Sequence, residues 1–199
     1  YAGTDTAFTL PDTLEDNTEY FWQVIAEDRL GMQTINNGGY VNFYTNVENE
    51  PPAEFELLSP NHNSIQSDLS PNFSWTASVD PDPLDSLWYR LEIFGPMVAY
   101  YFWQYIATTT ETNYTPDFSL FDNSRFSYLV TVNDQFEQSY STQEYIFYTD
   151  SIPEPPLNFS TIYPEDNSNI DNGQIEFIWN QTFDPDPLDE IQYQIVYAT

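Results

Sequence analysis

The chain has 199 residues, and its 32 Asp and Glu stand against three Arg and no Lys, which gives a formal net charge of −29. Such a surface repels phosphate backbones and anionic lipids, and this excludes nucleic acids and membrane surfaces as partners. The absence of Cys excludes disulfides and thiolate sites, and no apolar run approaches the ~20 residues of a membrane span. Apolar residues make up 40% of the chain and aromatic residues 18%, enough to build packed cores.

A domain-sized repeat organises the sequence. The hexapeptide Asp-Pro-Asp-Pro-Leu-Asp occurs at 80–85 and again at 184–189, a shift of 104 residues. Residues 50–95 align with residues 154–199 without a gap, with 16 identities in 46 pairs. A period of about a hundred residues indicates a tandem array of domains rather than a solenoid.

The N-terminal part belongs to the same array. Its Asp16-Asn17 pair returns as Asp122-Asn123, a shift of 106 residues. The repeat therefore divides the chain into the second half of one unit (1–50), a complete unit (51–153) and the first half of a third (154–199). We expect further repeat sequence beyond both ends, or neighbouring copies that complete the two half units.

Alternation of apolar and polar residues predicts β-strands throughout, and no amphipathic helix of useful length is present. In chain order the predicted strands are 20–26, 72–77, 87–93, 126–132, 142–149 and 191–197. About seven short strands in a hundred residues are typical of a β-sandwich. The sequence therefore predicts an all-β protein, with one complete seven-stranded sandwich between two half sandwiches.

Three patterns resemble the tandem fibronectin type III modules of bacterial secreted and cell-surface proteins. They are Phe73-Ser-Trp75, Tyr89-x-Leu-x-Ile93 and the segment 14–28, and the resemblance extends over the whole chain. It implies that Tyr20, six residues after Leu14, forms a tyrosine corner whose hydroxyl bonds back to the preceding loop. The complete unit has Phe126 at this position, so we expect the corner bond to be missing there.

No constellation of residues predicts an enzyme. The only His, His62, lies in a polar loop, and a lone loop His is usually solvent-exposed. The many carboxylates recur at the repeat period, as catalytic residues rarely do, so their proximity does not indicate a glycosidase pair. We expect a protein without catalytic activity.

The repeated acidic loop has two interpretations. In the first, carboxylates of the loop, of the incoming linker and of a loop at the same pole of the sandwich bind Ca²⁺, which prefers six to eight oxygen ligands. In the second, Asp-Pro-Asp-Pro is a stiff turn, in which Pro fixes φ and Asp accepts backbone N–H bonds. The preceding half unit could add Glu15 or Asp16. The candidate ligands are Glu50, Asp80, Asp82, Asp85 and Asp134, with Asp184, Asp186 and Asp189 in the next repeat.

An aromatic run follows the predicted strand 87–93. One face of a strand takes only alternate residues into its core, so large aromatics remain on the other face in either register. They are covered by a neighbouring loop, or they form a contact for another subunit or a sugar ring. The candidate contact residues are Tyr100, Tyr101, Phe102, Trp103 and Tyr105.

Two functions follow from these features. The first is a structural segment of a long, acidic, extracellular or cell-surface array, which acts as a stalk, filament or adhesin scaffold and contacts neighbouring copies of the same protein or array. Ca²⁺ at the module junctions would make such an array rigid. The alternative is a set of carbohydrate-binding accessory modules in a secreted hydrolase, with glycans as ligands of the aromatic run.

Overall fold

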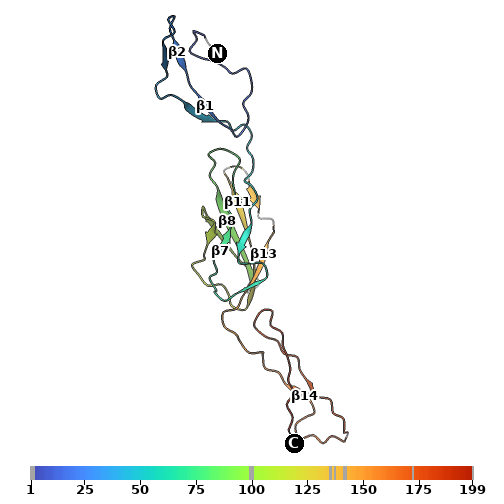
Figure 1. Ribbon diagram of the computed structural model, residues 1–199. Coiled ribbons are helices and arrows are strands. Elements are labelled where there is room, and N and C mark those ends of the chain that lie inside the picture. Colours follow the sequence, from blue (N-terminus) through green and yellow to red (C-terminus); the bar gives the residue numbers. More distant parts are fainter. Residues whose placement is uncertain are drawn as a thin grey trace.

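A computed structural model describes residues 3–98, 101–134, 136, 138–140, 143–171 and 173–198. These residues form fifteen strands and no helix, which confirms the all-β prediction. It follows that no described helix could cross a membrane. The chain forms an elongated body in which three parts follow one another along one axis (Figure 1).

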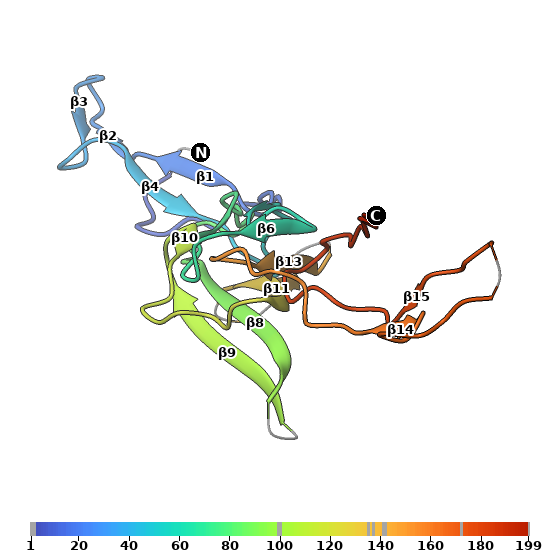
Figure 2. The ribbon, with the colours of Figure 1, turned by 90° about the horizontal axis from the view of Figure 1, so that it is seen from below.

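The central part, which corresponds to the complete unit, contains two sheets whose strands are antiparallel except for the parallel pair β6 and β13. A three-stranded sheet has the order β10-β7-β5, and a larger sheet has the order β6-β13-β11-β8-β9, with β12 also paired to β11. The strands β8 and β9 form a long hairpin that projects from the unit (Figure 2). The strand bounds are β5 Leu57–Ser59, β6 Ser64–Gln66, β7 Phe73–Trp75, β8 Trp88–Val98, β9 Tyr101–Thr109, β10 Asn113–Tyr114, β11 Ser124–Asn133, β12 Gln138–Tyr140 and β13 Tyr145–Thr149.

The unit therefore has nine described strands, where the sequence predicted seven. The segment 57–66, for which no strand was predicted, forms two strands separated at Pro60, which has no N–H to continue a ladder. Its first piece, β5, pairs with β7, whereas its second piece, β6, crosses to the other sheet and pairs in parallel with β13. The segment after β11 is likewise divided into β12 and β13, both antiparallel to β11.

One core joins the two sheets and lies entirely within this unit. Trp75 of β7 packs with the inward residues of β8, and Leu91 and Ile93 are fully buried there while Arg90 and Glu92 alternate outward. The alternation of apolar and polar residues in the sequence therefore predicted correctly which side chains of β8 face the core. Two sheets around one shared core make this unit a β-sandwich, as the sequence predicted. The other core residues are Phe55, Leu57, Phe73, Tyr89, Leu120, Phe126, Tyr128, Val130, Val132 and Phe147.

The flanking parts repeat the pairings of the central unit. In the N-terminal part, β1 (Glu19–Trp22) pairs with β4 (Val41–Tyr44), and β2 (Ile25–Glu27) pairs with β3 (Gln33–Ile35). In the C-terminal part, β14 (Thr161–Tyr163) pairs with β15 (Ile178–Trp179). The register is conserved: Tyr20 faces Phe43 as Phe126 faces Phe147, and Thr161 faces Trp179 as Leu57 faces Trp75.

Side chains of the core face are exposed in these flanking parts. Trp22 is 52% exposed, whereas its counterpart Tyr128 in the central unit is fully buried. Ile195 is 50% exposed, whereas its counterpart Leu91 is fully buried. In each flanking part, apolar side chains are therefore exposed whose counterparts are buried between the two sheets of the central unit.

The tyrosine corner is present where the sequence predicted it. The Glu15 N–H donates a hydrogen bond of 2.8 Å to the Tyr20 hydroxyl. In the central unit Phe126 has no hydroxyl; it is fully buried and stacks on Phe147 with ring centroids 5.5 Å apart. Two residues later in β11, the buried Tyr128 donates its hydroxyl to the Pro60 carbonyl at 2.9 Å. A different tyrosine therefore links β11 to the segment between β5 and β6.

Gly95 of β8 is required by the packing around Phe126. A Cβ at this position would lie 2.7 Å from the Phe126 ring and 2.8 Å from the Trp103 ring. Overpacking of this kind costs about 1–3 kcal/mol. We predict that Gly95→Ala destabilises the central unit by that amount, measured as a lower midpoint of thermal unfolding. Gly173→Ala is the matched control, because a Cβ there meets nothing within 4 Å; equal midpoints for the two variants would contradict the packing.

Candidate functional site

The acidic loop between β7 and β8 is held as a tight turn. The Asp82 N–H donates to Asp80 Oδ1 at 2.9 Å, and Leu84 has a left-handed φ of 72°. The second copy repeats this geometry, with the Asp186 N–H 3.0 Å from Asp184 Oδ1 and a φ of 69° at Leu188. These bonds support the interpretation of the loop as a stiff turn. They involve only one of the two carboxylate oxygens of Asp80.

The turn brings three carboxylates together at each copy of the loop. Oxygens of Asp80, Asp82 and Asp85 lie within 4.8 Å of one another, and so do those of Asp184, Asp186 and Asp189. The central member is buried in both copies, with exposed fractions of 3% for Asp82 and 6% for Asp186.

The linker that enters each unit is bonded to this buried aspartate. The Glu50 N–H donates to Asp82 Oδ2 at 3.0 Å. One repeat later the Glu154 N–H donates to Asp186 Oδ2 at 3.0 Å and to its Oδ1 at 3.2 Å. The predicted candidate Glu50 thus meets the loop, and its counterpart Glu154 also approaches Asp186 and Asp150 within 4.8 Å.

The preceding unit contributes an asparagine that the sequence analysis did not single out as a site residue. Asn17 Nδ2 donates to Glu50 Oε2 at 3.0 Å, and Asn123 Nδ2 donates to Glu154 Oε2 at the same distance. Both asparagines have a φ of 48°, a left-handed conformation that Asn tolerates. Their repetition at a shift of 106 residues was the signal that could have identified them.

The aspartate before each asparagine anchors the linker backbone instead. Asp16 accepts N–H bonds from Val47 at 2.6 Å and from Glu48 at 3.1 Å, and the Val47 bond is the main cause that lowers the pKa of Asp16. Asp122 accepts the Ser151 hydroxyl at 2.6 Å and its N–H at 2.8 Å, and the hydroxyl bond lowers the pKa of Asp122. Asp16 was a candidate ligand, and the structure shows it engaged with the linker. Glu15 instead takes part in the tyrosine corner through its backbone.

The carboxylates of the junctions raise one another's pKa. Burial raises the pKa of Asp80, and the charges of Asp82, Asp134 and Asp85 add to this effect. The bond from Asn17 lowers the pKa of Glu50, but the neighbouring Asp82, partial burial and the charge of Asp16 together raise it above its ordinary value. The ionised form of these carboxylates is therefore less stable at this site than in water.

The pKa values of Asp150 and Glu154 are likewise raised at the second junction. Burial raises the pKa of Asp150, and the charge of Asp186 is the next cause. The nearby Asp186 carboxyl raises the pKa of Glu154 more than the bond from Asn123 lowers it. The same electrostatic strain thus occurs at both junctions.

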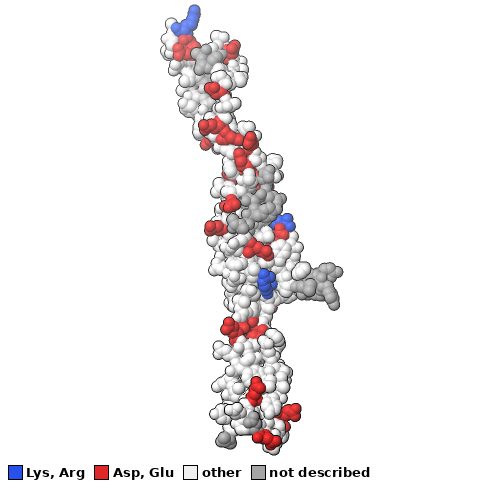
Figure 3. All heavy atoms as spheres, turned by 90° about the vertical axis from the view of Figure 1, so that its right-hand side faces the viewer, with Lys and Arg blue, Asp and Glu red and all other residues white. Residues whose placement is uncertain are grey.

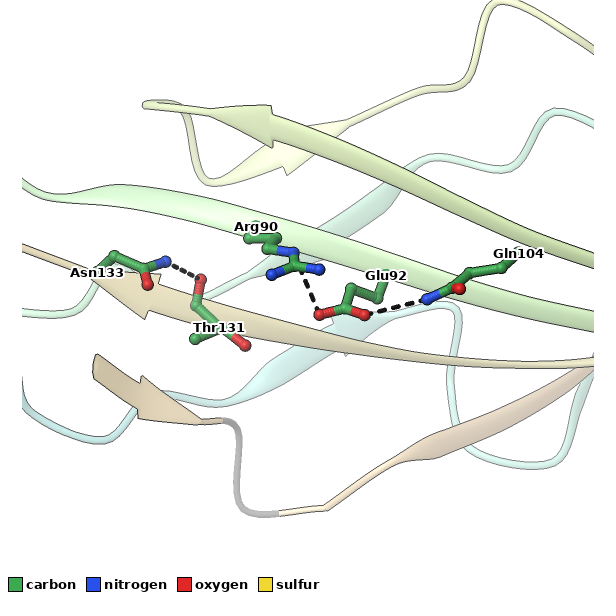
Figure 4. A network of polar contacts seen from close by, with 5 residues as sticks. All are labelled: Arg90, Glu92, Gln104, Thr131 and Asn133. Carbon is green, nitrogen blue, oxygen red and sulfur yellow. Dashed lines mark hydrogen bonds and ion pairs between the residues drawn. The ribbon is translucent and has the colours of Figure 1, made fainter. Parts of the chain in front are cut away.

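An ion pair between Arg90 and Glu92 lies away from the junctions. Arg90 Nε contacts Glu92 Oε1 at 3.2 Å, and Gln104 Nε2 donates to Glu92 Oε2, on the outer face of the large sheet (Figure 4). The same view shows Asn133 Nδ2 donating to the Thr131 carbonyl. On the face shown in Figure 3, acidic side chains gather at the two levels where successive parts meet, and arginine side chains lie elsewhere.

Asp134, the remaining candidate ligand, lies just after β11. It is 5% exposed, and its Oδ1 accepts the Phe136 N–H at 2.6 Å. It is outside the group of three carboxylates that meet within 4.8 Å, but its charge acts on Asp80. The structure therefore places Asp134 near the loop without bringing it into the group.

The aromatic run lies in and before β9, and its alternate residues face the core. Trp103 and Tyr105 are half-buried and pack against the core, with Trp103 edge-on to Phe126 and Tyr105 edge-on to Phe118. Phe102 is 81% exposed. Tyr100 and the side chain of Tyr101 lie outside the described residues. A partner contact by this run stays a prediction, and Phe102 is the described residue best placed to make it.

His62, the only histidine, has a structural contact. Its Nδ1 accepts the Ile146 N–H at 3.1 Å, and its ring lies 5.4 Å from the Tyr145 ring. This bond attaches the loop before β6 to β13.

The similarity of this chain to known proteins is low. No family model and no curated protein matches the sequence. A similar solved structure contains the FN1–FN3 domains of chicken CNTN1, with 14% identity and a TM-score of 0.39. The match covers 74% of this chain and 50% of the chicken chain. The fold assignment therefore rests on the strand order and register described above.

The bond between Tyr105 and Tyr114 gives a pH-dependent prediction. Their hydroxyls lie 2.6 Å apart, and this bond, followed by burial, raises the pKa of Tyr105 to about 12. An unfolded Tyr titrates near ~10, so the bond stabilises the fold below pH ~10 and this stabilisation is lost between pH ~10 and ~12. We predict that Tyr114→Phe moves the pKa of Tyr105 toward ~10, as followed by NMR of the ring carbons.

Tyr163→Phe in β14 is the control, because Tyr163 lies in a different part of the chain and should leave the titration of Tyr105 unchanged. An unaltered Tyr105 titration in Tyr114→Phe would contradict the role of the bond.

Proposed function

We propose that this protein is a non-enzymatic, extracellular or cell-surface structural segment, part of a longer tandem array of fibronectin type III-like modules that acts as a stalk, filament or adhesin scaffold. The observation that carries the proposal is the repetition of one junction. The contacts from Asn17 through Glu50 to Asp82 recur from Asn123 through Glu154 to Asp186 at nearly equal distances. A repeated junction attaches each module to the next in the same way, and this is the requirement for an extended array.

The exposed core faces of the flanking parts support the same proposal. The apolar face of the C-terminal part carries Phe159, Trp179 and Tyr193, the counterparts of the buried Phe55, Trp75 and Tyr89. The edge-on contact of Phe159 and Tyr193 repeats that of Phe55 and Tyr89, with centroids 5.6 and 5.7 Å apart. A face prearranged for a core needs a second sheet, which the rest of the module or a neighbouring copy would supply.

The acidic surface suits a scaffold. A net charge of −29 keeps neighbouring arrays apart in solution and favours surroundings rich in cations. The half-buried packing of Trp103 and Tyr105 gives these two rings a role within their own module, so no described contact favours a glycan-binding platform.

The scaffold proposal is tested by the shape of the chain in solution. A compact chain of this length has a radius of gyration of about 16 Å. We predict a value well above this from small-angle X-ray scattering, because the three parts are joined end to end. A value near 16 Å, or tight binding to a defined glycan that Phe102→Ser abolishes, would contradict the proposal.

A further inference from the structure

Three carboxylate oxygens at the first junction are buried and make no hydrogen bond to any described residue. They are Asp80 Oδ2, Asp82 Oδ1 and Asp85 Oδ2, which belong to the three residues whose carboxylates approach within 4.8 Å. Asp82 as a whole is only 3% exposed. The turn does not account for these atoms, because its bonds use the backbone and the other oxygen of Asp80. Buried carboxylates are normally paired with a charge or bound to a metal.

The asparagine of the preceding unit adds a neutral oxygen to the same region. Asn17 donates through Nδ2 to Glu50, and its Oδ1 is buried and makes no bond to a described residue. Asn123 repeats both features at the second junction. Each asparagine thus combines a bond to the linker glutamate with a buried amide oxygen that has no hydrogen-bond partner among the described residues.

We propose that each junction binds a calcium ion between successive modules. At the first junction Asp80, Asp82 and Asp85 form the centre of the site, Glu50 of the linker joins them, and Asn17 contributes its amide oxygen from the preceding module. At the second junction Asp184, Asp186 and Asp189 take the same roles, with Glu154 and Asn123. The rigidifying effect of the ion rests on the proposed scaffold function, whereas its binding does not.

The donor chemistry selects calcium among common cations. All the donors are oxygens, several of them carboxylates, and Ca²⁺ accepts six to eight oxygens in flexible geometry. Zn²⁺ prefers nitrogen and sulfur donors, and the chain has no Cys, while its single His is engaged with Ile146. Mg²⁺ demands a near-ideal octahedron and gives up its water reluctantly, so it should bind more weakly here.

The second site has a neighbouring carboxylate that the first site lacks. Asp150 lies within 4.8 Å of Glu154 and Asp186 at the second junction, whereas the corresponding residue of the first junction is Asn46. Calcium affinity rises with the charge of the ligand set. The second junction should therefore bind calcium more tightly than the first.

Isothermal titration calorimetry of the metal-free chain with CaCl₂ in 150 mM NaCl tests the proposal. We expect two specific sites with dissociation constants around 10⁻⁴ to 10⁻³ M, the range of extracellular calcium modules. Asp82→Asn should weaken the first site and Asp186→Asn the tighter second site, each by at least ~10-fold. Asp117→Asn is the matched control, since it makes the same charge change at an exposed position outside the junctions.

Asn17→Ala tests the contribution of the preceding module without changing the net charge. It should weaken the first site several-fold and leave the second unchanged, and Asn123→Ala should have the opposite pattern. Binding that Asp82→Asn and Asp117→Asn reduce equally would mean diffuse attraction to the acidic surface and would overturn the site. The absence of binding heat would also overturn it, whereas the scaffold proposal would stand or fall on the scattering measurement alone.

Discussion

The bond between a linker N–H and a buried aspartate of the next module is the contact on which the arrangement of the chain depends. It fixes the entry of Glu50 against Asp82 and of Glu154 against Asp186 at the same distance, 3.0 Å. Because the aspartate is buried, the bond is protected from water, and its loss would leave a charge without a partner. The direction in which each module leaves its predecessor therefore follows from the acidic loop.

The same loop ties this junction to the core of the module. Ser78, just before the loop, donates its N–H to the hydroxyl of the buried Tyr89 at 2.9 Å, and Thr182 donates to Tyr193 at 3.0 Å. The hydroxyls of Ser78 and Thr182 in turn bond to the carbonyls of Ala53 and Leu157 in the incoming linker. Hydrogen bonds thus connect the linker, the acidic loop and the core tyrosine in both repeats.

Much of the fold could be predicted from the sequence because the repeat and the strand alternation are local signals. The inner face of β8 and the tyrosine corner of Tyr20 followed from periodicity and from the resemblance. Two other features depend on contacts between distant segments. They are the division of 57–66 at Pro60 into strands of different sheets and the packing of Trp103 against Phe126. The acidic loop was visible in the sequence, but the roles of Asn17 and Asn123 were not, since an Asp-Asn pair in a loop also suits a simple turn.

If the junction holds adjoining modules at a fixed angle, electron–electron double resonance should detect it. The chain has no Cys, so spin labels can be placed at Thr34→Cys and Thr108→Cys, exposed positions on either side of the first junction. We expect one narrow distance distribution in calcium, which broadens when calcium is removed or when Asp82→Asn is introduced. An equally broad distribution in all three samples would contradict a fixed junction.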